Sequence, residues 1–190
     1  MAFDAYLKSL TAALKRGDAT EHTHRPSLKT LIESFANGVT ATNEPKRIVC
    51  GAPDYIVTKG VVPVGYVEAK DVNTDLSKVE GDEQLKRYRA SLRNLILTDY
   101  LEFRYYRNGV PTLTARLGKW QKNGVLKRDA EGEKAVADLF KWFIEAEVES
   151  IGSPRELAQK MAQLARMIHD LIAKAFEAEG GRWRSGRASP

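Results

Sequence analysis

Apolar residues recur at helical spacing near the start of the chain and again after residue 130. The first two stripes predict helices at residues 3–16, with Gly17 as a stop, and from about Pro26 to Asn37-Gly38. Residues 82–92 and 131–147 predict two more helices. The apolar positions are Phe3, Tyr6, Leu7, Leu10, Ala13 and Leu14 in the first helix, Leu28, Leu31, Ile32 and Phe35 in the second, and Val136, Leu139, Phe140 and Phe143 in the last.

Alternating or continuously apolar segments predict strands in the middle of the chain. Residues 54–58 and 64–70 flank a turn at Lys59-Gly60, which is the pattern of a β-hairpin. Further strands are expected at 47–50, at 94–98, and at 101–106 and 112–117 around the Asn108-Gly109 turn, whereas the polar residues 71–81 predict a loop. Helices and strands in this order predict an α/β or α+β domain around a mixed sheet.

The last third of the chain has a different character. Ser153-Pro154 predicts the start of a long helix that runs to about residue 179, with Ser153 as N-cap and Glu156 as its capping-box partner. The apolar spacing fits either a seam for another helix or an amphipathic helix packed on its own domain. We therefore expect a core at 1–128, a helical extension or connector at 129–179, and a disordered tail at 180–190. The apolar positions of the long helix are Leu157, Met161, Leu164, Ile168, Leu171 and Ala175.

The composition of the 190 residues, with 43% hydrophobic and 29% charged, is that of an ordinary globular protein. No segment approaches the roughly 18 consecutive apolar residues that a membrane span needs, and the first residues lack the features of a signal peptide. Cys50 is the one cysteine, so an internal disulfide is excluded. We expect a cytoplasmic protein without a membrane partner.

The net charge of +5 favours a polyanionic partner. Three arginines in the last ten residues contribute much of this excess, so a local cluster of cations near the hairpin is more informative. Within it, Lys86, Arg87 and Arg89 are the first candidates for contacts to DNA; a solvated surface is the alternative. The cluster consists of Lys86, Arg87, Arg89, Arg93, Arg104 and Arg107.

Asp54, Glu68 and Lys70 are the candidate chemical groups of the hairpin. Glu68 and Lys70 are two residues apart on a strand and therefore share a face, while Val67 and Ala69 point to the core. Two carboxylates and a backbone carbonyl, that of Ala69, suit Mg²⁺, and a lysine beside them can orient or deprotonate an attacking water. Each residue alone is more often a turn former or a member of a surface ion pair, but together they favour a phosphodiesterase site.

Two helices are expected to complete this site. Gln84 and Tyr88 are four residues apart and share a face, from which they can position water, phosphate or the lysine. Glu33 can supply a third carboxylate from the second helix, with Glu21, expected in a loop, as its competitor. The neighbouring His22 and His24 are expected to be surface residues rather than DNA contacts.

The motifs resemble those of a known family. Pro53-Asp54 followed by Glu68-Ala69-Lys70 is similar to the PD-(D/E)xK nuclease pattern, and Gln84-x-x-x-Tyr88 resembles the helix extension of many restriction nucleases. Longer stretches resemble the amino-terminal nuclease domain of single-chain Type ISP and Type IIG restriction-modification enzymes. These stretches are residues 20–29, 43–48, 51–54, 84–88 and 94–100.

The resemblance implies a restriction-endonuclease-like mixed β-sheet flanked by helices, and a Mg²⁺-dependent endonuclease of double-stranded DNA in which Mn²⁺ substitutes. It implies that Asp54 and Glu68 bind the metal, that Lys70 is the catalytic lysine, and that Gln84 and Glu33 complete the site. It also implies methyltransferase and target-recognition domains, for which this chain has no room. Two alternatives stay open: a non-catalytic nucleic-acid-binding or assembly module on the same scaffold, and a repair or recombination nuclease.

Overall fold

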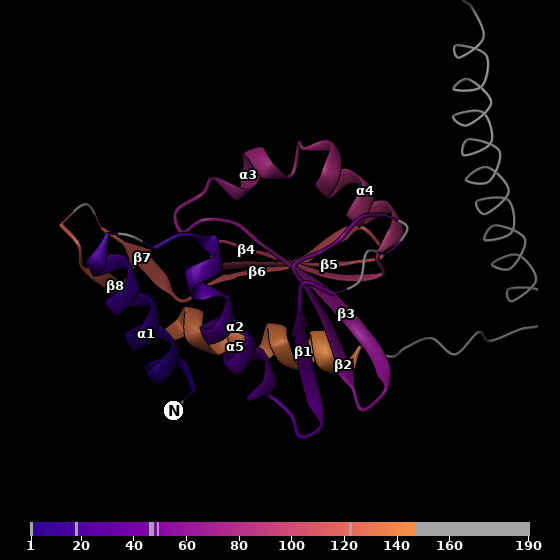
Figure 1. Ribbon diagram of the computed structural model, residues 1–190, viewed down its shortest axis with the longest axis horizontal. Coiled ribbons are helices and arrows are strands. Elements are labelled where there is room, and N and C mark those ends of the chain that lie inside the picture. The colour runs from indigo at the N-terminus through magenta and orange to yellow at the C-terminus, as the bar shows by residue number, and fades with distance from the viewer. Residues whose placement is uncertain (1, 18, 46–47, 49, 122, 147–190) are drawn as a thin grey trace, which may run out of the picture. The chain divides into compact units, whose positions relative to one another are not determined.

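The computed structural model describes residues 2–17, 19–45, 48, 50–121 and 123–146. The expected long helix from Ser153, its apolar seam and the tail at 180–190 lie outside these residues. The described part is built around one sheet with helices on both faces (Figure 1). None of its helices is both long enough and apolar enough to cross a bilayer.

The central sheet has six strands in the order of the sequence, β1 to β6. All neighbours are antiparallel except β3 and β4, which are parallel, so the sheet is mixed. The strands are β1 (Val39–Asn43), β2 (Tyr55–Lys59), β3 (Val62–Ala69), β4 (Asn94–Thr98), β5 (Glu102–Arg107) and β6 (Val110–Arg116). A separate two-stranded sheet joins β7 (Gly118–Trp120) to β8 (Leu126–Arg128).

The helices divide between the two faces of the sheet. In the view of Figure 1, α1 (Ala2–Arg16), α2 (Glu21–Glu33) and α5 (Ala130–Glu145) lie below the sheet. The short helices α3 (Leu76–Val79) and α4 (Glu83–Ser91) lie above it and form the crossover between the parallel strands β3 and β4. Parallel neighbours need such a crossover, which here places α4 over the end of β3.

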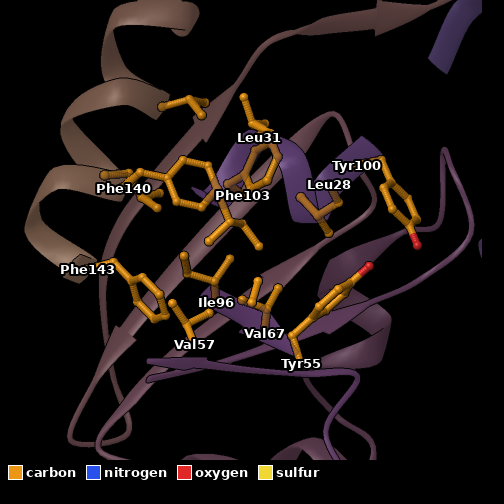
Figure 2. Packing of buried hydrophobic residues seen from close by; sticks show 14 of the residues in the cluster. Leu28, Leu31, Tyr55, Val57, Val67, Ile96, Tyr100, Phe103, Phe140 and Phe143 are labelled. Carbon is orange, nitrogen blue, oxygen red and sulfur yellow. The ribbon is translucent and has the colours of Figure 1, made fainter. Parts of the chain in front are cut away.

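The larger apolar core lies between the sheet and α1, α2 and α5. Phe140 and Phe143 of α5 and Leu31 of α2 pack against Val67 and Ile96 of the sheet (Figure 2). A smaller cluster under α3 and α4 contains Leu76, Val79, Leu85, Tyr88, Leu92, Leu95, Leu97 and Tyr106. Each face of the sheet therefore has its own apolar layer.

Helix α5 belongs to the core, although the sequence pattern assigned it to an extension that begins at residue 129. A Cβ atom at Gly65 of β3 would lie only 2.4 Å from the Phe143 ring, so the glycine is what lets the helix approach the strand. The Asn94 Nδ2 atom also donates to the Phe143 carbonyl oxygen at 2.8 Å. These contacts move the end of the packed core beyond residue 128.

Most of the predicted elements are confirmed, among them the 54–70 hairpin, the strands around Asn108-Gly109 and the helix at 82–92. The second helix is an exception, since it begins at Glu21 and contains Pro26, which we expected in its first turn. Strand β1 and the β7–β8 pair were not anticipated, because their short polar sequences carry little strand signal. The loop expected at 71–81 contains the one-turn helix α3. In the strand expected at 47–50, Ile48 forms only an isolated bridge with Gly51, and residues 47 and 49 are not described.

Candidate functional site

Asp54 and Glu68 lie opposite each other at one end of the β2–β3 hairpin. Tyr55 pairs with Val67 in the antiparallel register, so Asp54, which precedes Tyr55, faces Glu68 across the two strands. Residues opposite each other in such a ladder have Cα atoms about 4.5–5.5 Å apart. The Asp54 Oδ2 atom accepts a hydrogen bond from the Ala69 backbone N–H at 2.8 Å. The hairpin register therefore brings the two predicted carboxylates together.

Lys70 lies beside Glu68, as the two-residue spacing predicted. Its Nζ atom is 2.7 Å from Glu68 Oε1, while Val67 and Ala69 are buried in the main core on the other face. The Lys70 backbone N–H donates to the Thr98 carbonyl at 2.8 Å, which holds this end of β3 against β4. The predicted separation of the chemical face from the core face is confirmed.

The Glu68 carboxylate is buried and only partly compensated. Its side chain is 5% exposed, and Oε2 has no hydrogen-bond partner among the described residues. Burial and, to a smaller extent, the neighbouring charge of Asp54 raise the pKa of Glu68 to about 7, although the Lys70 ion pair opposes this shift. The single ion pair with Lys70 therefore does not supply enough positive charge to keep the Glu68 carboxylate fully ionised at neutral pH.

A divalent cation fits this donor set. The described residues contain no group of three or more His, Cys, Asp or Glu side chains placed to hold a metal ion. Mg²⁺ does not need such a group, because it commonly binds one or two protein carboxylates and keeps several waters. The two facing carboxylates and the unpartnered Glu68 Oε2 suit that mode of binding, with the Ala69 carbonyl as the predicted third ligand.

Arg25 of α2 is a member of the site that the sequence interpretation did not single out. Its Nη2 atom is 2.5 Å from Asp54 Oδ1 and its Nη1 atom is 2.8 Å from Glu44 Oε1. The guanidinium is buried, with 7% of the side chain exposed. Position 25 lies three residues before Leu28 and thus on the apolar stripe of α2. A charged residue on such a stripe is a signal of a buried ion pair, and it could have identified Arg25.

The histidines before Arg25 differ from each other. His22 is exposed, as expected, and its ring lies 4.0 Å from Glu44. His24 is buried, so the expectation of a surface residue is wrong for it; its ring packs edge-on against Tyr100 at 5.1 Å. Burial lowers the pKa of His24, which favours the neutral imidazole. Because α2 begins at Glu21, its apolar stripe includes the turn that carries His24, which explains why His24 is buried.

Gln84 and Tyr88 of α4 lie over the same end of the hairpin. The Gln84 Nε2 atom donates to the Tyr88 hydroxyl at 3.1 Å, and both residues line a small cleft with Glu68 and Lys70. The Tyr88 ring packs against Gly51, where φ is +137° and a Cβ atom would approach the ring to 2.9 Å. Tyr88 thus contacts Gln84 on its own helix and Gly51 in the loop that leads to Asp54.

Asp82 is a further acidic residue of this cleft that was not anticipated. It is the N-cap residue of α4 and lines the cleft together with Glu68, Lys70 and Gln84. Its carboxylate makes no capping hydrogen bond, although aspartate at this position often does. Its place at the start of the predicted 82–92 helix is the sequence signal, but that signal points to a cap rather than to this cleft.

The Glu33 carboxylate makes its contacts with α2 and β1. It pairs with Lys29 and accepts from the Ala41 backbone N–H at 2.9 Å, which joins the end of α2 to β1. Glu21 is the first residue of α2 and not a loop residue. The choice between Glu33 and Glu21 as a third catalytic carboxylate stays a prediction, and the described contacts of Glu33 are those of a helix–strand link.

The cations around α4 are used in different ways. Lys86 pairs with Glu83 at 2.8 Å, and Arg87 is exposed. Arg89 donates twice to the Gly109 carbonyl, at 3.1 and 2.9 Å, and its guanidinium lies 4.9 Å from the centre of the Tyr106 ring. Arg104 pairs with Glu80 and Glu102. Of the three residues expected to contact DNA, Arg89 therefore also anchors α4 to the β5–β6 turn.

Comparison with known proteins supports the fold. No family model matches the chain, and no curated protein matches it significantly. The structure is similar to a chain in a cryo-EM structure of a DrdV–DNA complex, with a TM-score of 0.60 and 21% identity. The match covers 77% of this chain and 97% of that one. At this identity the similarity shows the fold alone, and it confirms the predicted restriction-endonuclease-like α+β architecture of a mixed sheet flanked by helices.

Proposed function

We propose that the chain is a Mg²⁺-dependent endonuclease domain that cleaves double-stranded DNA, as in restriction-modification enzymes. The observation that carries the proposal is the Asp54–Glu68 pair, which faces Lys70 and contains a buried carboxylate oxygen without a hydrogen-bond partner among the described residues. DNA as the partner is supported by the similar fold of a chain in a DNA complex. The methyltransferase and target-recognition domains, and a cytoplasmic location, rest on the sequence resemblance.

The residues divide the work of phosphodiester hydrolysis. Asp54 and Glu68 would hold the cation, with the Ala69 carbonyl as third protein ligand and Mn²⁺ as a substitute for Mg²⁺. Once bound, the cation supplies Lewis-acid stabilisation of the phosphate and lowers the pKa of water. Lys70 orients the attacking water and offsets negative charge that builds up on the phosphate. Gln84 and Tyr88 line the same cleft and keep that water and Lys70 in place.

Cleavage of supercoiled plasmid in Mg²⁺ tests the catalytic assignment. Asp54→Asn, Glu68→Gln and Lys70→Met should each reduce the cleavage rate by about 100-fold or more, because each removes a group needed in the transition state. Asp4→Asn and Lys127→Met are matched controls. Asp4 pairs with an arginine as Asp54 does, but beside β8, and Lys127 is an exposed lysine of that strand.

The result would contradict the proposal if the three site variants cleaved as fast as the two controls. Salt-sensitive DNA binding by a wild-type chain that does not cleave would instead favour the non-catalytic alternative. Comparison of duplex DNA with branched or nicked DNA separates the repair or recombination nuclease, whose site chemistry would be the same.

Cation binding can be tested without cleavage. Mn²⁺ at about 100 times its dissociation constant should stabilise the wild-type chain by about 2.7 kcal/mol, which corresponds to a rise in Tm of about 5–10 °C. Asp54→Asn and Glu68→Gln should lose most of this rise, whereas Asp4→Asn should keep it. An equal rise in all four proteins would place the cation elsewhere.

A further inference from the structure

Two elements outside the β2–β3 hairpin contact Asp54. Arg25 of α2 donates to its carboxylate, and the Glu44 backbone N–H, just after β1, donates to its carbonyl oxygen at 2.8 Å. The Glu44 carboxylate pairs with the other nitrogen of the Arg25 guanidinium, with 2.8 Å between Nη1 and Oε1. The Tyr55 hydroxyl donates to the Arg25 carbonyl at 2.8 Å and fixes α2 against β2. The side chain and the backbone of Asp54 are thus held by the same small network.

The two carboxylates at the site each have a cation of their own. Arg25 pairs with Asp54, and Lys70 pairs with Glu68. The two pairs differ in freedom, because Arg25 is 7% exposed and bridges two acids, whereas the Lys70 side chain is 25% exposed and ends in a rotatable ammonium. A planar guanidinium with two acceptors fixes the orientation of a carboxylate more tightly than an ammonium does.

We propose that Arg25 is a positioning residue of the nuclease centre, which orients the Asp54 carboxylate toward Glu68 so that the pair is arranged for a divalent cation before the cation arrives. This rests on the proposed function in so far as Asp54 is a cation ligand. Arg25 is buried behind Asp54 and acts through it. The chemistry of hydrolysis stays with Asp54, Glu68 and Lys70.

Arg25→Lys separates orientation from charge. Lysine keeps the positive charge but cannot bridge Asp54 and Glu44 with a planar fork, so Mn²⁺ affinity, measured by calorimetric titration of the full chain, should fall about 10-fold. The cleavage rate at saturating Mn²⁺ should stay within about threefold of wild type, because the cation, once bound, restores the geometry.

Arg128→Lys is the matched control. Arg128 also bridges two carboxylates, Asp4 and Glu133, at 2.8 Å each, but on β8. Its replacement should leave Mn²⁺ affinity unchanged. Wild-type Mn²⁺ affinity in Arg25→Lys would overturn the proposal. A large loss of cleavage rate at saturating Mn²⁺ would also overturn it, because Arg25 would then act in the chemical step.

A double-mutant cycle keeps the test independent of cation binding. Arg25→Met should lower the Tm by about 10 °C, because it leaves Asp54 uncompensated beside Glu68. Adding Asp54→Asn should recover about half of that loss, since a neutral amide needs no counter-ion. The corresponding cycle of Arg128→Met and Asp4→Asn should be additive, because both side chains are about half exposed.

The two sets of results distinguish the possible failures. A wild-type chain that binds no Mn²⁺ but shows the Arg25–Asp54 coupling would refute the proposed function and leave the network as a structural device. A wild-type chain that binds Mn²⁺ and cleaves, with no coupling between Arg25 and Asp54 and no loss of affinity in Arg25→Lys, would refute the positioning role alone.

Discussion

The two faces of the central sheet use the same strands but bury different groups. The face covered by α1, α2 and α5 is a large apolar core, to which β3 contributes Val67 and Ala69. The face covered by α3 and α4 has a smaller apolar cluster, and at its edge lie Glu68 of β3 and Lys70, the residue that follows this strand. One strand therefore supplies stability to one side and charged chemistry to the other. The site can hold a poorly compensated carboxylate because the opposite face stabilises the strand that carries it.

The largest effect should come from breaking the apolar face. Phe143→Ala removes a fully buried ring that packs on Gly65 of β3, and it should lower the free energy of unfolding by about 3–5 kcal/mol in urea denaturation. Trp142→Ala, on the same helix but 52% exposed, should cost less than about 1 kcal/mol. Similar losses for the two variants would show that α5 is not part of the core.

The pH dependence of stability should sharpen the contrast on the charged face. The pKa of Glu68 is raised from 4.5 to about 7, so its contribution to stability is full below about pH 4.5 and is lost as the pH rises through 7. Glu68→Gln carries no charge in this range. Without added cation, its stability relative to wild type should therefore grow by on the order of 2 kcal/mol between pH 5 and pH 8.

Thermal unfolding of both proteins across that pH range is the measurement. A constant difference between them would mean that the Lys70 ion pair fully compensates Glu68 in the folded chain.

A smaller effect is expected where the charged face is held together by Arg89. Arg89→Gln loses the paired hydrogen bonds to the Gly109 carbonyl and the contact with Tyr106, so unfolding free energy should fall by about 1–2 kcal/mol. Denaturant titration gives the value. Unchanged stability would show that these contacts of Arg89 do not stabilise the fold, and contact with DNA would remain its expected role.

The smallest change in stability is expected at Arg87, which is exposed on α4. Arg87→Gln should alter unfolding free energy by less than about 0.5 kcal/mol and should lower the slope of log K against log salt for DNA binding by about 1. Filter binding at several salt concentrations measures the slope. An unchanged slope would indicate that DNA does not contact this face of α4.

Local sequence signals predicted the frame of the site. The two-residue spacing of Glu68 and Lys70 placed both on one face, and the four-residue spacing of Gln84 and Tyr88 placed them within hydrogen-bond distance. Two other expectations depended on distant parts of the chain and were less successful. The start of α2 was misplaced at Pro26, because its packing on the core extends the helix backward to Glu21. His24 was expected on the surface, but Tyr100, 76 positions later, covers it.

The sequence alone predicts most of the helices and strands in their order, the shared face of Glu68 and Lys70, and the acidic and basic residues at the hairpin end. These follow from period and spacing, which are properties of a few neighbouring residues. Only the folded structure shows that Arg25 reaches Asp54 across 29 positions and that α5 supports β3 from the other side. Burial, and with it the raised pKa of Glu68, depends on which distant segments meet, and no local pattern contains that information.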